Sequence, residues 1–209
     1  MIKNFIFDID GTLLDTIEMY IPALQSTLEK HGYSRDYDSL TKLFGITSVD
    51  ILKITGVKED DIQPILKEWL DLAYTRTDRV TVFDGITSVL ENLSKRPDIN
   101  LVVVTSKTTD EYLSEFAKNY PISKLFDSYI TADDTAKHKP DPDPIIAGIQ
   151  KVEAIPEESI YIGDTGNDMK AAIAAKAHFG AAMWGTAQPE NLASAEYKFA
   201  TPNDILKLI

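Results

Sequence analysis

The chain contains no cysteine, and only three histidines occur among its 209 residues. Thiol nucleophiles, disulfides and thiolate metal sites are therefore excluded. The histidines, His31, His138 and His178, are scattered and form no metal-ligand spacing. The sequence also lacks a stretch that is long and apolar enough to span a bilayer, and its first residues show no signal-peptide pattern. We therefore expect a soluble cytoplasmic protein with no membrane partner.

Positively charged residues are few. Lysine and arginine together number 21 against 33 aspartates and glutamates, so the net charge is -12. No basic stripe is present, and we expect no nucleic-acid partner. An acidic protein that binds an anionic substrate must concentrate its positive charge locally, in a metal ion and one or two lysines. The length suits one sizeable domain, or a core with a small accessory domain, acting as a monomer or a homodimer.

Two aspartates, Asp8 and Asp10, follow an apolar run near the N-terminus. Residues 3–7 predict a short buried strand, which Gly11 ends. Side chains alternate along a strand, so both carboxylates point the same way and repel each other. A hard, oxygen-binding cation beside them would remove that cost, which makes Mg²⁺ the first hypothesis. The alternative is that both are only turn residues, which explains two acids at one strand tip less well.

The second half of the chain alternates strand-like and helix-like segments. Strands are predicted at 99–105 and 159–163, more weakly at 129–131 and 179–183, and helices at 109–118, 144–152 and 167–177. Such alternation predicts an α/β fold, namely a doubly wound, Rossmann-like core in which helices cover both faces of a parallel sheet.

The segment between residues 16 and 82 breaks this alternation, because it contains no convincing strand. Helices are predicted at 17–30, 49–54 and 61–74. We interpret the segment as an inserted α-helical cap domain over 15–82, with the core formed by 1–14 and 83–209. Within the cap, Phe44-Gly45-Ile46 is either a loop that faces the substrate or a helix end with a C-cap glycine.

Further polar residues fall at the ends of the other predicted strands. They are Thr105, Lys139, Asp164 and Asp168. Ligands of open α/β sheets bind beyond the carboxyl ends of the strands, so these residues are candidates for one site. Taken singly they are weak signals. Thr105 could simply end a strand, Lys139 could be a solvated loop lysine, and Asp164 could only cap the next helix.

Taken together and in this order, the residues resemble the haloacid dehalogenase superfamily, in particular its phosphoglycolate phosphatase-like members with a small helical cap. The segments FDIDGTLLD at 7–15 and GDTGND at 163–168 carry most of the resemblance. The helical insertion after the first motif matches the position of the superfamily's cap.

The resemblance implies chemical roles for the acidic residues. Asp8 would be the nucleophile that attacks phosphorus and forms an aspartyl-phosphate. Asp10 would be the general acid, and then the general base for the hydrolytic water. Mg²⁺ would be held by the Asp8 carboxylate, the Asp10 backbone carbonyl and Asp164, with Asp168 beside them or one step further out.

The resemblance also implies a phosphate-binding set. Thr105, Ser106 and Lys139 would bind the phosphoryl oxygens, whose charge must be neutralised during transfer. Lys137 is close enough in sequence to take the place of Lys139. We favour Lys139 because the superfamily's lysine directly precedes a proline, here Pro140.

The expected function is therefore Mg²⁺-dependent hydrolysis of a small phosphorylated metabolite, with phosphoglycolate as the first guess. An inorganic pyrophosphatase of the same superfamily is the alternative enzyme. A non-catalytic module that binds a phosphate ligand and a partner-binding protein that uses its acidic surface remain open as well. Tyr20 stands where superfamily mutases carry histidine, and dehalogenases lack the second aspartate found here as Asp10, so neither of those activities is expected.

Overall fold

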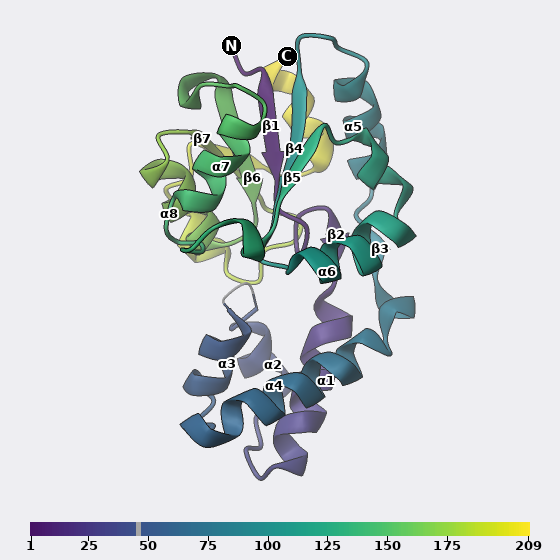
Figure 1. Cartoon of the computed structure of the whole chain (residues 1–209), viewed down its shortest axis with the longest axis vertical. Coiled ribbons are helices and arrows are strands. Elements are labelled where there is room, and N and C mark those ends of the chain that lie inside the picture. Colours follow the sequence, from purple (N-terminus) through teal and green to yellow (C-terminus); the bar gives the residue numbers. More distant parts are fainter. Residues whose placement is uncertain (45–46) are drawn as a thin grey trace. The chain divides into compact units, whose positions relative to one another are not determined.

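The fold is described from a computed structural model covering residues 1–44 and 47–209 (Figure 1). The expectation for Phe44-Gly45-Ile46 depends on Gly45 and Ile46, which lie outside these described residues. The chain forms two compact units. One comprises Met1–Leu13 and Val82–Ile209 and is called the core unit, and the other comprises Leu14–Thr81 and is called the helical unit.

The core unit contains a six-stranded sheet in the order β5-β4-β1-β6-β7-β8, and its strand pairs are parallel. The strands are β1 (Asn4–Phe7), β4 (Asn100–Val104), β5 (Ser128–Ile130), β6 (Ser159–Gly163), β7 (His178–Ala182) and β8 (Tyr197–Phe199). The α-helices are α5 (Ile86–Ser94), α6 (Thr109–Glu111), α7 (Asp143–Lys151) and α8 (Gly166–Ala174). Other helical segments are η2 (Tyr112–Ala117), η3 (Pro121–Leu125), η4 (Ala132–Asp134), η5 (Pro156–Glu158), η6 (Pro189–Leu192) and η7 (Pro202–Leu208).

The strand order confirms the expected fold class. Renumbered within the sheet alone, the order is 3-2-1-4-5-6, which is that of doubly wound Rossmann-like folds. The winding reverses between β1 and β6, where Phe7 pairs with Ile162. Ligands of such sheets bind at this switch point, beyond the carboxyl ends of the strands. The residues that follow β1 and β6 are Asp8 and Asp164.

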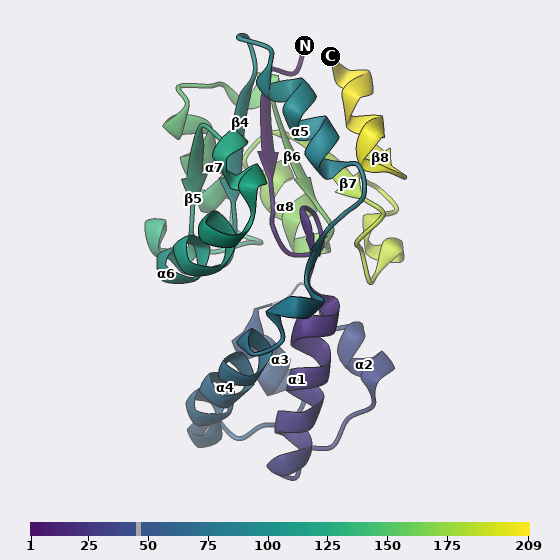
Figure 2. The same ribbon diagram turned by 90° about the vertical axis from the view of Figure 1, so that its right-hand side faces the viewer.

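Helices cover the sheet on both faces. Helices α7 and α8 pack on one face, and α5 lies on the other beside the C-terminal η7 (Figure 2). Strand β1 is therefore apolar on both sides, and Phe5, Ile6 and Phe7 are completely buried. Helix α7 approaches the sheet closely at Gly148, where a Cβ atom would lie 2.7 Å from Cγ2 of Val104.

The helical unit has its own apolar core. It is built from α1 (Ile17–Lys30), α2 (Tyr37–Thr41), α3 (Ser48–Ile54), α4 (Glu59–Tyr74) and η1 (Thr77–Arg79). Its largest buried side chain is Trp69, whose Nε1–H donates to the carbonyl of Tyr20 across the α1–α4 contact at 2.9 Å. Among the described helices, none combines the length and apolar character needed to cross a membrane.

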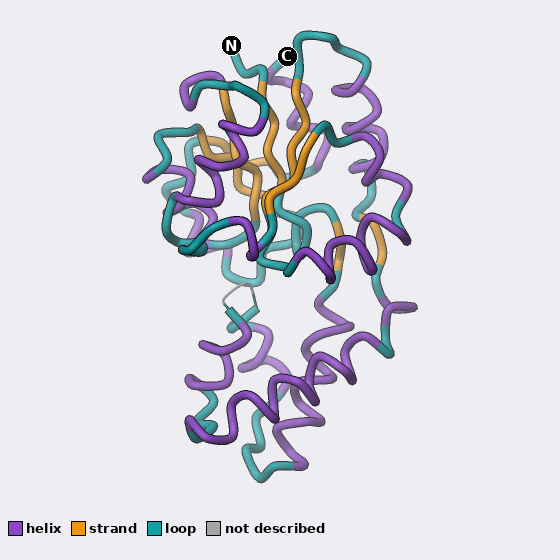
Figure 3. Tube along the Cα trace, in the orientation of Figure 1, coloured by secondary structure: helices purple, strands orange, loops and turns teal. Residues whose placement is uncertain are grey.

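Some short elements differ from the prediction. Strand β3 (Thr81–Val82) pairs with β2 (Leu14–Asp15) as a separate two-stranded sheet, whereas no strand was predicted between residues 16 and 82 (Figure 3). Helix α2 and strand β8 were not predicted either. Strands of two or three residues and a helix of five are too short to show a hydrophobic period.

Replacing Ile145 of α7 with alanine should lower the free energy of unfolding by about 2–5 kcal/mol. Ile145 is completely buried against the sheet, so the truncation leaves a cavity. The control is Ile173→Ala on α8, where the side chain is 62% exposed and the change should stay within about 0.5 kcal/mol. Urea unfolding measures both variants, and equal losses would contradict the packing of α7.

Candidate active site

Asp8 is fixed at the switch point of the sheet. Its backbone N–H donates to the carbonyl of Ile162 at 3.0 Å, which extends the β1–β6 pairing by one residue. Its Oδ1 accepts the N–H of Ile9 at 2.8 Å, and its Oδ2 accepts the ammonium of Lys139 at 2.9 Å. Both oxygens are thus oriented by donors, and the residue is only 8% exposed.

The turn that follows Asp8 is held from two sides. Gly11 has a φ of +74°, and a Cβ atom there would lie 2.3 Å from Oδ2 of Asp164, so only glycine fits. The Thr12 hydroxyl donates to Oδ1 of Asp164 at 3.3 Å. From the loop after β7, the Trp184 indole N–H donates to the Thr12 carbonyl at 3.0 Å. A Cβ atom at Gly185 would lie 1.8 Å from the Gly11 carbonyl oxygen, so this loop is also in direct contact.

Asp8, Asp164 and Asp168 form a compact group of carboxylates. Each offers an oxygen within 4.8 Å of the others. Asp164 directly follows β6, and Asp168 lies in the first turn of α8, where it forms a capping box with Thr165. The Thr165 backbone N–H donates to Oδ2 of Asp168 at 3.0 Å, which leaves Oδ1 free to face the site.

Lys139 is the cation of this group. Its Nζ donates to Oδ2 of Asp8 at 2.9 Å, Oδ1 of Asp168 at 2.8 Å and the hydroxyl of Tyr161 at 2.9 Å. Burial alone would lower the pKa of Lys139, but Asp168 and Asp8 outweigh that effect and hold the pKa well above its ordinary range. Lys137, in contrast, is 64% exposed and pairs with Asp141 at 3.6 Å, so the geometry favours Lys139.

The acidic group carries more negative charge than Lys139 balances. Burial raises the pKa of Asp8 to about 6, with Lys139 opposing and Asp168 adding to the shift. Burial, Asp168 and Asp8 also raise the pKa of Asp164 well above its ordinary range. Carboxylate oxygens are the ligands that Mg²⁺ prefers. The donor set and its excess charge therefore fit a divalent cation of this type.

The Asp10 carboxylate lies outside the group of three. Its Oδ2 pairs with the ammonium of Lys107 at 3.0 Å, and the Lys107 side chain is only 7% exposed. Its Oδ1 is buried and has no hydrogen-bond partner among the described residues. The family resemblance implies that the Asp10 backbone carbonyl, not its carboxylate, faces the metal.

The two hydroxyl residues predicted to bind phosphate follow β4, next to β1. Val103 pairs with Phe7, so Thr105 lies beside the start of the Asp8 turn. The Thr105 hydroxyl is buried and accepts the backbone N–H of Lys107 at 3.2 Å. Ser106 is exposed, in contrast to Thr105.

Tyr161 and Thr12 contact the site as well, and neither is among the site residues predicted from the sequence. Tyr161 lies within an apolar strand, and its strand pattern predicts only core packing. The available signal was chemical, because the hydroxyl of a buried tyrosine usually requires a polar partner. Thr12 directly follows Gly11, and its hydroxyl could have been expected at the same turn.

Known proteins are similar to this chain in sequence and in fold. The sequence profile of haloacid dehalogenase-like hydrolases matches residues 5–182. The chain belongs to this family. This confirms the resemblance found in the sequence, and the family generally uses Mg²⁺, consistent with the carboxylate group.

Individual relatives carry phosphatase and pyrophosphatase names. A phosphoglycolate phosphatase of Aquifex aeolicus is 27% identical over 213 residues, covering 99% of this chain and 96% of the relative. The pyrophosphatase PpaX of Oceanobacillus iheyensis is 28% identical over 211 residues, covering 100% and 97%. A Lactobacillus plantarum protein of known crystal structure, provisionally assigned as a phosphoglycolate phosphatase, superposes with a TM-score of 0.93 at 29% identity, covering 100% of both chains.

The metal-free protein should lose stability as the pH rises from 5 to 7.5. The folded-state pKa of Asp8 is about 6 against an ordinary value of 3.8, so its stabilising proton is lost across this range. We expect the melting temperature in EDTA to fall by about 5 °C. The melting temperature of the Asp8→Asn variant should fall less over the same pH range, because the asparagine side chain cannot ionise.

Adding Mg²⁺ should raise the melting temperature of the wild type more at pH 7.5 than at pH 5, because the metal requires ionised carboxylates. Differential scanning calorimetry at both pH values checks both statements. A metal-free protein that becomes more stable toward pH 7.5, or an Asp8→Asn variant with the same pH slope, would contradict them.

Proposed function

We propose that this protein is a Mg²⁺-dependent phosphatase that hydrolyses a small organic phosphomonoester through an aspartyl-phosphate on Asp8. The single observation that carries the proposal is the Asp8 carboxylate itself. It is buried, oriented by the Ile9 N–H and the Lys139 ammonium, and grouped with Asp164 and Asp168. A carboxylate placed in this way is an oriented nucleophile beside a cation-binding donor set.

The first step forms a bond between an Asp8 oxygen and phosphorus and breaks the phosphorus–oxygen ester bond. Asp10 protonates the departing oxygen. In the second step Asp10 takes a proton from a water molecule whose oxygen attacks phosphorus, and the Asp8–phosphorus bond breaks. Mg²⁺ held by Asp8, Asp164, the Asp10 carbonyl and Asp168 would supply positive charge for the phosphoryl oxygens.

The contacts of Asp10 suit its two proposed roles as general acid and general base. Lys107 holds one carboxylate oxygen, Oδ2, and thereby fixes the orientation of the carboxyl group. The other oxygen, Oδ1, is buried without a partner among the described residues. Oδ1 is thus the oxygen that can carry the proton and pass it to the leaving group.

Two compounds are the first candidate substrates to be tested. Phosphoglycolate is supported by the phosphoglycolate phosphatase of Aquifex aeolicus, which aligns over almost the entire chain. Inorganic pyrophosphate is the second candidate, supported by the PpaX pyrophosphatase of Oceanobacillus iheyensis at similar identity. Phosphate release from a panel of small phosphomonoesters and from pyrophosphate, with and without Mg²⁺, separates them.

Asp8→Asn should reduce phosphate release at least about 1,000-fold, because an amide is a poor nucleophile toward phosphorus. Acid quenching with a ³²P-labelled substrate should trap labelled protein in the wild type and none in this variant. Asp10→Asn should retain the carboxylate nucleophile and serves as the comparison. Retained turnover in Asp8→Asn would exclude the covalent route.

Lys139→Met should lower kcat/KM at least about 100-fold, since it removes the buried cation from the reacting groups. Lys137→Met is the matched control, because Lys137 is solvent-exposed and pairs only with Asp141 among the contacts described above. It should keep activity within about twofold of wild type. The assignment of the phosphate-binding lysine would be reversed if Lys137→Met were the inactive variant.

A further inference from the structure

We infer that Tyr161 is a positioning residue that holds the Lys139 ammonium in place through its phenolic oxygen. The kinetic effects expected from this inference rest on the proposed function. The position of the Lys139 ammonium follows from the hydrogen bonds alone.

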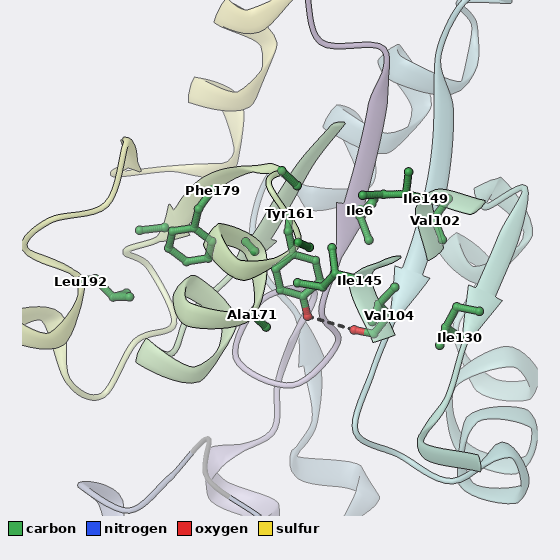
Figure 4. Packing of buried hydrophobic residues seen from close by; sticks show 14 residues of the cluster. Ile6, Val102, Val104, Ile130, Ile145, Ile149, Tyr161, Ala171, Phe179 and Leu192 are labelled. Atoms are coloured by element: carbon green, nitrogen blue, oxygen red, sulfur yellow. Dashed lines mark hydrogen bonds between the residues drawn. The ribbon is translucent and has the colours of Figure 1, made fainter. Parts of the chain in front are cut away.

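The Tyr161 side chain links two strands on either side of β1. It arises in β6 beside Ile6, and its hydroxyl donates to the carbonyl of Val104 at the end of β4 at 3.0 Å (Figure 4). The residue is completely buried, and burial raises the pKa of Tyr161 well above its ordinary range. The hydroxyl therefore keeps its proton and has a fixed direction.

The direction of that hydrogen bond determines what the oxygen can do next. A backbone carbonyl can only accept a hydrogen bond, so the phenolic O–H donates to Val104. The lone pairs of the phenolic oxygen can then accept a hydrogen bond from another donor. Lys139 is that donor, with Nζ 2.9 Å from the oxygen.

The phenol completes the coordination of the ammonium. Lys139 has three N–H donors, and its acceptors are one oxygen each of Asp8, Asp168 and Tyr161. The first two acceptors are charged and belong to the reacting group, whereas the third is neutral and anchored to β4. Without it, one buried N–H loses its partner and the ammonium can shift between the carboxylates. Asp8 would then lose the donor that orients its Oδ2.

Core packing alone does not account for this residue. The ring lies among apolar neighbours such as Ile145 and Ala171, where phenylalanine would fill the same space (Figure 4). Placing a hydroxyl in such surroundings costs free energy unless it is hydrogen-bonded. Here the hydroxyl has two hydrogen bonds, one from Lys139 in the site and one to the backbone carbonyl of the last residue of β4.

The test is Tyr161→Phe, which removes the oxygen and keeps the ring. We expect kcat to fall about tenfold while KM changes less than about threefold. Tyr112→Phe is the matched control, because Tyr112 is also a buried tyrosine of the core unit but stacks on Tyr129, and the hydrogen bonds of Lys139 go to other residues. It should leave both parameters unchanged. In a Lys139→Met background, Tyr161→Phe should cause no further loss, because the two residues act as one unit.

A second readout does not depend on catalysis. The Lys139 ammonium should give a ¹H–¹⁵N signal in wild type that is absent from Lys139→Met. Tyr161→Phe should shift or broaden this signal, and Tyr112→Phe should not. An unmoved signal together with unchanged kcat would overturn the inference. A wild type without turnover on any substrate, but with a signal that moves in Tyr161→Phe, would support the positioning role and reject the proposed function.

Discussion

The contact between the Lys139 ammonium and the carboxylates of Asp8 and Asp168 is the interaction on which the rest of the site depends. It joins the end of β1, the segment before α7 and the first turn of α8 at distances of 2.9 and 2.8 Å. Buried charges are costly unless they are paired and hydrogen-bonded, and removing one partner leaves the others uncompensated. The pairing therefore holds three distant segments in one arrangement and also orients the nucleophile proposed for the reaction.

The sheet topology explains why these segments meet. Strand β1 lies between β4 and β6, so Asp8, Thr105 and Asp164 all emerge at one edge. Because β1 is buried on both faces, its end is held by packing as well as by the strand pairs. Groups placed on such rigid elements keep a defined geometry more readily than groups carried by loops. Tyr161 connects Lys139 to these rigid strands in the same way, because its hydroxyl hydrogen-bonds both Lys139 and the Val104 carbonyl of β4.

Much of this arrangement could be predicted from the sequence. The remaining parts could not be predicted, for physical reasons. The alternation of apolar strands and amphipathic helices predicts the α/β core, and Asp8 and Asp164 directly follow two of those strands. Lys139 lies in a segment without periodicity, so no pattern separates it from Lys137, and the choice depended on the proline that follows. The role of Tyr161 depends on a contact made across β1, which a linear pattern cannot show.

The charge balance of the site bears on how an acidic protein could bind the proposed anionic substrate. Asp8, Asp10, Asp164 and Asp168 carry four negative charges when ionised, and Lys107 and Lys139 carry two positive charges, which leaves a net charge of -2. That deficit equals the charge of one divalent cation. Burial raises the pKa values of both Asp8 and Asp164, which is the direction expected for buried carboxylates whose charge is not fully compensated. Protons and a divalent cation would therefore compete for the same carboxylates, and the proposed phosphate dianion would meet a less negative site when the cation is bound.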